Sequence, residues 1–553
     1  MNNTLSKSDL AISAVGSSRL GPACIETIRQ VAIGMIAALA VGCSKTAKPC
    51  DRCDLLVIAA TGEPETLLPP AIGETVGRDI SDLVFERLAS LKPGASPVDD
   101  AGFEPRLAAR WDRVDSLTWR VHLRPGATWH DGQPVTARDV QFSFEAYQDT
   151  TVYPSGAGTL DRLTVSADDD STVSIRFKTL GSENRYDGFT QVRVLPRHIW
   201  EPKPRAGWVT DTSRARLIGS GPFKVIAWDK GTSLTLERTG SPPPGTARRI
   251  VWRFTHDQDA AVNLLLSGEA DLVETITSPS GRERVAGDTA LRRVPYASAV
   301  YGFLGFRLAN PVLADVRIRR ALTHGLDRAT IARSVFGEGV AVPPGPMSRA
   351  LWIWSDSIKT LGFDTAGAAL LLDEAGWRRG PDGVRARGGR PLSVDILIPS
   401  TSASRRQLAQ AIQESWRRLG VSATVTAVDF PVFQERTGKG KFDSFIGAWA
   451  DEPSPRALKG QWTASGLGGQ NQTGYASARF DSLLDAASAA PEAGAAGRLW
   501  REAMDTLNAD APAVWLYALQ NMAVMRNRMP TPVIDPFSWL TGAEAWKISR
   551  PPR

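Results

Sequence analysis

One stretch near the carboxyl end of the chain carries residues that could bind a charged ligand. Residues 442–449 form a short apolar run of strand-like composition, which continues through Trp449, Ala450 and Asp451 into a proline-broken segment at 452–455. An aromatic ring and a carboxylate at a strand end can face a ligand cleft, so one hypothesis is that Asp451 meets a cationic group. The alternative is a core strand whose Asp451 caps the next turn. These residues taken alone favour the alternative.

Length and charge narrow the class of protein. At 553 residues the chain is too long for a single core, so two or three domains are expected. Lysine and arginine number 65 against 59 acidic residues, a net charge of +6. The basic residues are scattered and form no clustered stripe, so we expect no nucleic-acid partner.

The chain lacks the compact motifs that mark common enzymes. It has no P-loop, no H-E-x-x-H, no EF-hand loop and no G-x-S-x-G nucleophile elbow. His130 and Asp131 are adjacent and could orient one another, but Asp131-Gly132 is also what a turn requires. The acidic run at 168–170 lacks the spaced ligands of a calcium loop. We therefore expect no catalytic residues, no metal site and no cofactor.

The amino terminus carries a targeting signal. Arg29 precedes an apolar run at 31–41, which is long enough for a signal peptide and too short to span a bilayer. The run ends in Leu-Ala-Val-Gly-Cys43, which resembles the lipobox of bacterial lipoproteins. This resemblance implies a signal peptide at 1–43, a lipid on Cys43 and a linker at 44–54. The alternative is an ordinary secretory signal with an incidental cysteine, and Cys50 and Cys53 in the linker suit a small disulfide.

The second half of the chain predicts a parallel sheet. Residues 392–398 and 421–428 have strand composition, and between them a helix places Leu408 and Trp416 on one face. Strand, helix and strand at this spacing form a crossover, hence an α/β domain. Ligands bind beyond the carboxyl ends of such strands, which is where the run ending at Asp451 would lie.

Local patterns predict further elements. These are a buried strand at 55–60, a helix at 79–91, a half-buried strand at 116–123, helices capped by Thr136, Asp315 and Asp327, and a structural turn at 219–222. In that turn, Gly219 and Gly221 permit backbone conformations closed to other residues, and Pro222 fixes φ before a strand.

Five segments in a fixed order resemble the family 5 extracellular solute-binding proteins, the receptors of peptide- and nickel-type ABC importers. They are LTWRVHLRPGATWHDGQPVTARDVQFSFE at 117–145, LPRHIW at 195–200, IGSGPFKV at 218–225, SGEAD at 267–271, and NP at 310–311 followed by DVRIRRAL at 315–322. The similarity covers about residues 55–536. It implies an α/β, two-lobed periplasmic-binding-protein-like fold of type II, in the large cluster that has an extra inserted subdomain.

The resemblance also implies domain boundaries and a site. Lobe I would comprise residues 55–75, 205–285 and 521–553, an inserted subdomain residues 76–204, and lobe II residues 286–520. Oligopeptide receptors of the family hold a peptide's α-ammonium with an aspartate in a W-x-x-D-like segment, and Asp451 is the matching position, beside Trp449 and Ala450.

The expected function is therefore a non-enzymatic, lipid-anchored receptor. It would capture a small solute, most readily a peptide, outside the cytoplasmic membrane and deliver it to an ABC permease. Dipeptides, oligopeptides, nickel chelates, opines and oligosaccharides all bind to this scaffold, so the ligand stays open. Two other classes also stay open, an exported hydrolase or transferase and a receptor that signals to a membrane sensor.

Overall fold

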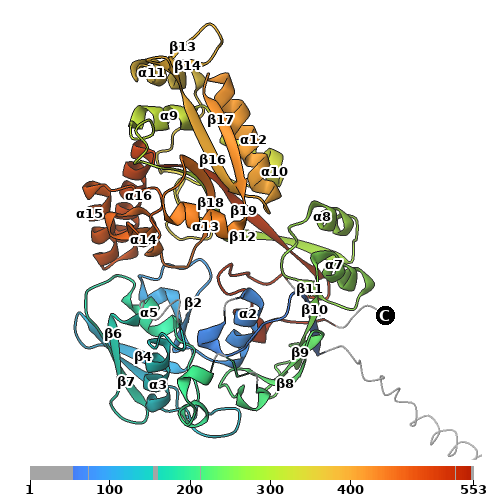
Figure 1. Cartoon of the computed structure of the whole chain (residues 1–553). Coiled ribbons are helices and arrows are strands. Elements are labelled where there is room, and N and C mark those ends of the chain that lie inside the picture. The colour runs from blue at the N-terminus through green and yellow to red at the C-terminus, as the bar shows by residue number, and fades with distance from the viewer. Residues whose placement is uncertain are drawn as a thin grey trace, which may run out of the picture. The chain divides into compact units, whose positions relative to one another are not determined.

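Two long strands run through both lobes of this α/β protein. The computed structural model describes residues 54–72, 74–153, 160–208, 210–211, 213–529 and 531–549. In it, β12 (Leu291–Phe306) and β19 (Ala513–Arg526) pair antiparallel at the centre of a ten-stranded sheet, in the order β17-β16-β18-β12-β19-β11-β1-β10-β9-β8 (Figure 1). The first half of β12 lies on the lobe I side and its second half pairs with lobe II, so one sheet connects the lobes.

Lobe I contains the strands at one end of this sheet. They are β1 (Leu55–Thr61), β8 (Phe223–Asp229), β9 (Ser233–Arg238), β10 (Arg249–Thr255) and β11 (Leu272–Val273), with helices α2 (Thr75–Val84), α7 (Gln258–Ser267) and α8 (Pro279–Ala286). β1 pairs in parallel with β10 and β11, and the strand expected at 55–60 is confirmed. Ile80 and Leu83 of α2 pack against Ile58 of β1, in a core that Trp539 and Trp546 near the carboxyl terminus also enter.

The chain between α2 and β8 forms a third region, which has its own sheet and its own hydrophobic core. Its strands are β4 (Ala108–Arg113), β5 (Thr118–Leu123), β6 (Leu163–Ala167) and β7 (Thr172–Phe177), with the pair β2 (Ala89–Leu91) and β3 (Phe103–Pro105) and the helices α3 (Ala137–Tyr147), α5 (Asn184–Thr190) and α6 (Arg197–Trp200). Its hydrophobic core runs from Leu88 to Val194. Thr136 and Asp139 form a capping box at the start of α3, as the expected cap requires.

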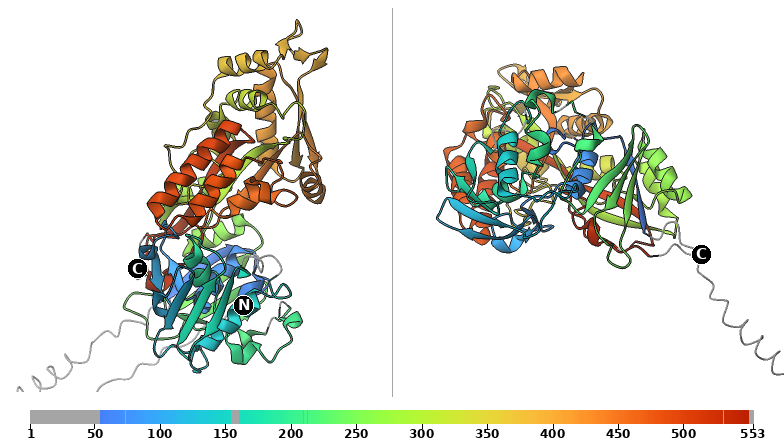
Figure 2. Two further views of the ribbon diagram at one scale, coloured as in Figure 1. Left: turned by 90° about the vertical axis from the view of Figure 1, so that its left-hand side faces the viewer. Right: turned by 90° about the horizontal axis from the view of Figure 1, so that it is seen from below.

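Lobe II contains the predicted crossover. β16 (Ser393–Pro399) and β17 (Ser422–Val428) pair in parallel, α12 (Ala403–Arg418) connects them, and β18 (Ser444–Ala450) pairs in parallel with β16. The other helices are α9 (Val316–His324), α10 (Arg328–Phe336), α11 (Thr365–Glu374), α13 (Phe430–Gly438), α14 (Ala457–Trp462), α15 (Ala478–Ala489) and α16 (Ala493–Asp510). The side chains of Asp315 and Asp327 cap α9 and α10 as expected. Figure 2 shows α15 and α16 packed side by side.

Short elements complete the described chain. They are the small sheet β13 (Arg378–Arg379), β14 (Arg385–Arg387) and β15 (Arg390–Pro391), and the 3-10 helices Pro69–Ala71, Asp100–Gly102, Arg205–Gly207, Arg214–Arg216, Ala464–Gly466 and Ala543–Ala545. Among the described residues, no helix combines the length and the apolar composition needed to cross a membrane. The expected signal peptide, Cys43, Cys50 and Cys53 lie outside the described residues.

The helix expected at 79–91 is wrong at both ends. It begins four residues earlier, at Thr75, and stops at Val84, while residues 89–91 form β2. A tertiary contact determines where the helix stops, because the turn at 219–222 packs against the carboxyl end of α2. The carbonyl oxygen of Val84 accepts a hydrogen bond from the backbone N–H of Gly221 at 2.9 Å.

The same contact corrects the role expected for Gly219 and Gly221. Neither has a positive φ, so neither supplies a special backbone conformation. A Cβ on Gly219 would instead lie 1.8 Å from the carbonyl oxygen of Val84, and one on Gly221 would lie 2.4 Å from that of Leu83. The glycines therefore allow a close approach of two backbones.

Candidate ligand-binding site

Asp451 lies on the wall of a cavity of about 680 Å³. β18 ends at Ala450, and the backbone N–H of Asp451 donates to the carbonyl oxygen of Ala299 at 2.7 Å. Ala299 lies where the pairing of β12 with β19 shifts in register, between Ala297 and Tyr301. The irregularity in the long strands and the end of β18 thus meet at one point, and both line the cavity.

The cavity is bounded by lobe I, the third region and the loop that follows β18. Ala59–Thr61 at the carboxyl end of β1, one face of α2, residues 86–91, and segments 296–300, 450–453 and 535–542 contribute to its wall. The carboxyl ends of β1 and β18 are where a ligand is expected in such a sheet. The volume falls in the range of about 300–1,000 Å³ of small-ligand sites.

The carboxylate of Asp451 has no cationic partner among the described side chains. Its Oδ2 accepts a hydrogen bond from the backbone N–H of Ser348 at 2.5 Å. Burial raises the pKa of Asp451 to about 7, and the hydrogen bonds from Ser348 only partly oppose this effect. A carboxylate in this condition gains most from a cation that arrives with a ligand.

The structure brings two of the three predicted residues to the cavity. Ala450 and Asp451 line it, whereas Trp449 is not among the lining residues. Trp449 pairs with Tyr301 across the sheet and packs against the core of lobe II. The aromatic residues of the wall come from elsewhere in the chain, and they include Tyr153, Tyr186, Tyr296 and Trp539.

Sequence reasoning missed most of the charged residues of the cavity. Its wall contains eight carboxylates and four arginines. Asp82 is bound by Arg193 at 2.6 Å and Arg87 at 2.8 Å, which hold its pKa well below the usual range despite burial. Asp535 has its pKa raised to about 6 by burial. No local motif marks these residues, because segments far apart in the chain bring them together.

Contacts between the third region and lobe II lie next to Asp451. Ser454 hydrogen-bonds to the carboxylate of Glu183, and Arg456 forms an ion pair with Asp187. The backbone N–H of Ser182 also donates to the carbonyl oxygen of Ser488 at 2.6 Å. The first two contacts hold the loop after β18 against the third region, and the third holds α15 against it.

The histidines do not converge on the cavity. His130 does not orient Asp131. Its ring lies within hydrogen-bonding distance of the backbone of Gly219 and Gly221, whereas Asp131 pairs with His198 at 2.8 Å. Burial lowers the pKa of His130. Both histidines thus have structural partners, and in the described parts of the chain no three His, Cys, Asp or Glu side chains gather as metal ligands would.

The sequence between residues 102 and 471 matches the family described as bacterial extracellular solute-binding proteins, family 5. The chain belongs to this family. This solute-binding protein is 23% identical over 513 residues to the oligopeptide-binding protein AppA of Bacillus subtilis. The alignment covers 90% of this chain and 92% of AppA. It is also 23% identical to the dipeptide-binding protein of Escherichia coli, over 87% of this chain and 92% of that protein.

Solved structures show the same fold. AppA of Bacillus subtilis in complex with a nonapeptide superposes on this solute-binding protein with a TM-score of 0.69 at 22% identity, over 90% of this chain and 99% of AppA. NikZ of Campylobacter jejuni in complex with Ni(L-His) also gives a TM-score of 0.69, at 24% identity and over 89% and 99% of the two chains. The two-lobed periplasmic-binding-protein-like fold is thus confirmed.

Proposed function

We propose that this protein is the substrate-binding lipoprotein of an ABC importer, which captures a peptide between its lobes and delivers it to a membrane permease. The observation that carries the proposal is the carboxylate of Asp451, which lies uncompensated on the cavity wall. The α-ammonium of a peptide has the charge and the donors to satisfy it. Relatives named for oligopeptide and dipeptide binding support this choice of ligand.

The proposed mechanism is closure of the two lobes by hinge motion. The register shifts of β12 and β19 around residues 297–303 are a suitable hinge, because these two strands carry the chain between the lobes. In the proposed closed form, the contacts of Ser454 with Glu183 and of Arg456 with Asp187 hold lobe II against the third region at one edge of the cavity. A ligand would favour closure only through contacts that it makes in the closed form, such as one with Asp451.

Lobe I would comprise residues 55–75, 205–285 and 521–553, the inserted subdomain residues 76–204, and lobe II residues 286–520. Cleavage before Cys43 would remove the signal peptide, so that Cys43 becomes the amino terminus, carries the lipid and anchors the protein outside the cytoplasmic membrane. Residues 44–54 would then separate the anchor from lobe I.

Native mass spectrometry of the purified protein tests the ligand class. We expect co-purified species with peptide masses, which defined tripeptides displace. A retained nickel chelate, opine or oligosaccharide would replace the peptide while leaving the receptor class intact. Steady release of product from peptides or esters, in place of saturable binding, would overturn the receptor function itself.

A further inference from the structure

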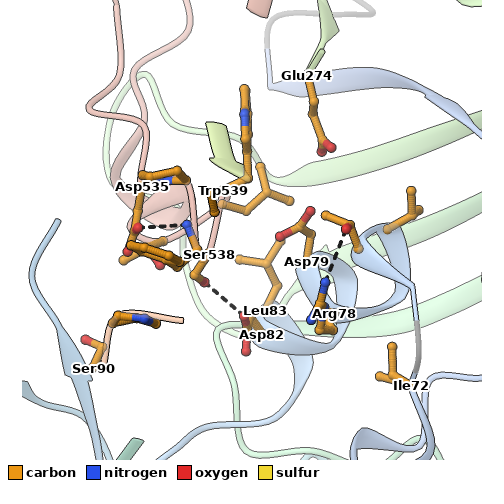
Figure 3. Close-up of a pocket in the computed structure, with 18 of the residues that line it drawn as sticks. Ile72, Arg78, Asp79, Asp82, Leu83, Ser90, Glu274, Asp535, Ser538 and Trp539 are labelled. Carbon is orange, nitrogen blue, oxygen red and sulfur yellow. Dashed lines mark hydrogen bonds between the residues drawn. The ribbon is translucent and has the colours of Figure 1, made fainter. Parts of the chain in front are cut away.

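Two carboxylates away from Asp451 face one another in the cavity. Asp79 projects from α2, and Glu274 follows directly after β11 in lobe I. Figure 3 shows their carboxyl groups directed toward one another, with Trp539 beside Asp79. Both residues line the same cavity as Asp451.

Among the described residues, these two carboxylates lack the ion pairs that buried acids normally have, and Asp79 has a hydrogen bond from the backbone of Trp539. Asp79 is 3% exposed, and its Oδ2 and the Oε1 of Glu274 have no hydrogen-bond partner among the described residues. Burial raises the pKa of Glu274 to about 7, and burial together with the charge of Glu274 raises that of Asp79 well above its usual value. A buried carboxylate without a partner is costly, and two together are more so.

Arg78 compensates the pair only in part, because it forms no ion pair with either carboxylate. Its side chain is exposed and lines the same cavity, and its charge lowers the pKa of Asp79 without cancelling the effect of burial. Its guanidinium donates to Thr75 Oγ1 at 3.3 Å. Asp82 on the same helix differs, because Arg87 and Arg193 both form ion pairs with its carboxylate.

Aromatic rings form the adjoining wall. Trp539 and Tyr296 both line the cavity, and their ring centroids lie 6.4 Å apart in an edge-to-face arrangement. The hydroxyl of Tyr296 hydrogen-bonds to the side chain of Thr275 and to the carbonyl oxygen of Glu274, which holds the ring in place. Carboxylates beside aromatic faces suit an organic cation.

We propose that Asp79 and Glu274 form a second cation subsite, which binds an ammonium or guanidinium group of the ligand other than the group bound at Asp451. This inference rests on the proposed function and narrows it to ligands that carry two positive charges, such as a peptide with a lysine or arginine side chain. Among the described residues no third acid, histidine or cysteine joins the pair as a metal ligand would, whereas an ammonium donates three hydrogen bonds that two carboxylates can accept.

The test compares matched tripeptide pools that differ only in lysine or norleucine at one position, with cadaverine as a free diamine. Binding to the purified protein is measured by calorimetry for the wild type and for the double variant D79N/E274Q. The control is E86Q/E544Q, which also removes two cavity charges, but from carboxylates that Arg124 binds at 3.1 Å and Arg106 binds at 2.7 Å.

We expect the wild type and the control to prefer the lysine pool by about 30-fold or more, and the double variant to lose this preference while still binding the norleucine pool. Equal affinity of the wild type for the two pools would overturn the second subsite and leave peptide binding standing. Binding of cadaverine alone, dependent on Asp79 and Glu274, would support the subsite and overturn the peptide function. Binding of none of these probes would overturn both.

Discussion

Replacing Asp451 with asparagine removes the charge proposed to bind the ligand's ammonium while keeping the size of the side chain. Moving the pKa of this carboxyl from 3.8 to about 7 costs its ionised form about 4 kcal/mol at most, since one pKa unit corresponds to about 1.4 kcal/mol. A bound ammonium recovers much of this cost. Truncation of one side of such a pair weakens binding by about 2–5 kcal/mol, which is roughly 30-fold to several thousand-fold in Kd.

The assay is calorimetric titration of a tripeptide and of its N-acetylated form into the wild type and Asp451→Asn. Acetylation removes the ammonium, so it should weaken binding to the wild type strongly and to the variant only slightly. The two losses should therefore not add, which is the signature of a direct interaction.

The pH dependence follows from the sign of the pKa shift. The empty wild type holds a proton on Asp451 below about pH 7, so affinity for the free-amine peptide should rise as the pH increases toward 7. Above about pH 8 it should fall again, as the peptide's own amino group loses its proton. Glu274 and Asp535 titrate in the same region, so the difference between the wild type and the variant isolates Asp451.

Stability gives an independent check. The unfolded chain releases the proton of Asp451 near pH 4 and the folded protein near pH 7, so this group lowers the stability of the empty protein as the pH rises between these values. The melting temperature of the empty variant should thus be higher than that of the wild type at pH 8 and equal to it at pH 4. Equal peptide affinities of variant and wild type, with or without acetylation, would refute the assignment of Asp451.

Three further predictions concern other parts of the chain. Mass spectrometry of the membrane-extracted protein should find lipid on an amino-terminal Cys43, and an unmodified cysteine there would remove the anchor. Arg528→Met should lower the free energy of unfolding by about 3–5 kcal/mol in denaturant titration, because it removes a guanidinium that binds the buried carboxylate of Asp271 at 2.7 Å. Gly219→Ala should cost about 1–3 kcal/mol or more in the same assay, since its Cβ would collide with the carbonyl oxygen of Val84.

Matched variants control the two stability predictions. Arg417→Met breaks the ion pair with Glu414 on an exposed face of α12 and should leave unfolding unchanged. Gly207→Ala adds a methyl group where no atom lies within 4 Å, and it should be tolerated. Equal losses in Arg528→Met and Arg417→Met, or in the two glycine variants, would contradict the roles given to burial and close approach.

Local patterns were sufficient for much of the fold. The crossover from β16 through α12 to β17 follows from strand composition and one apolar helix face, and the caps at Thr136, Asp315 and Asp327 follow from side chains that bond to the next turn of backbone. These signals act over a few residues, so a single stretch of sequence contains them. The helix at 79–91 failed because its end is determined by Gly221, more than 130 residues away.

The sequence by itself determined the family, the two-lobed α/β fold and the position of Asp451 at a strand end. Only the tertiary structure decided which side chains share the cavity with Asp451: Trp449 packs away from it, and Asp79 and Glu274 enter it from α2 and the end of β11. The physical reason is that burial and charge pairing depend on contacts between distant segments. Asp79 and Asp82 are alike in type and lie on one helix, and they differ because Arg87, just past the end of α2, and Arg193, 111 residues from Asp82 in the chain, both bind Asp82.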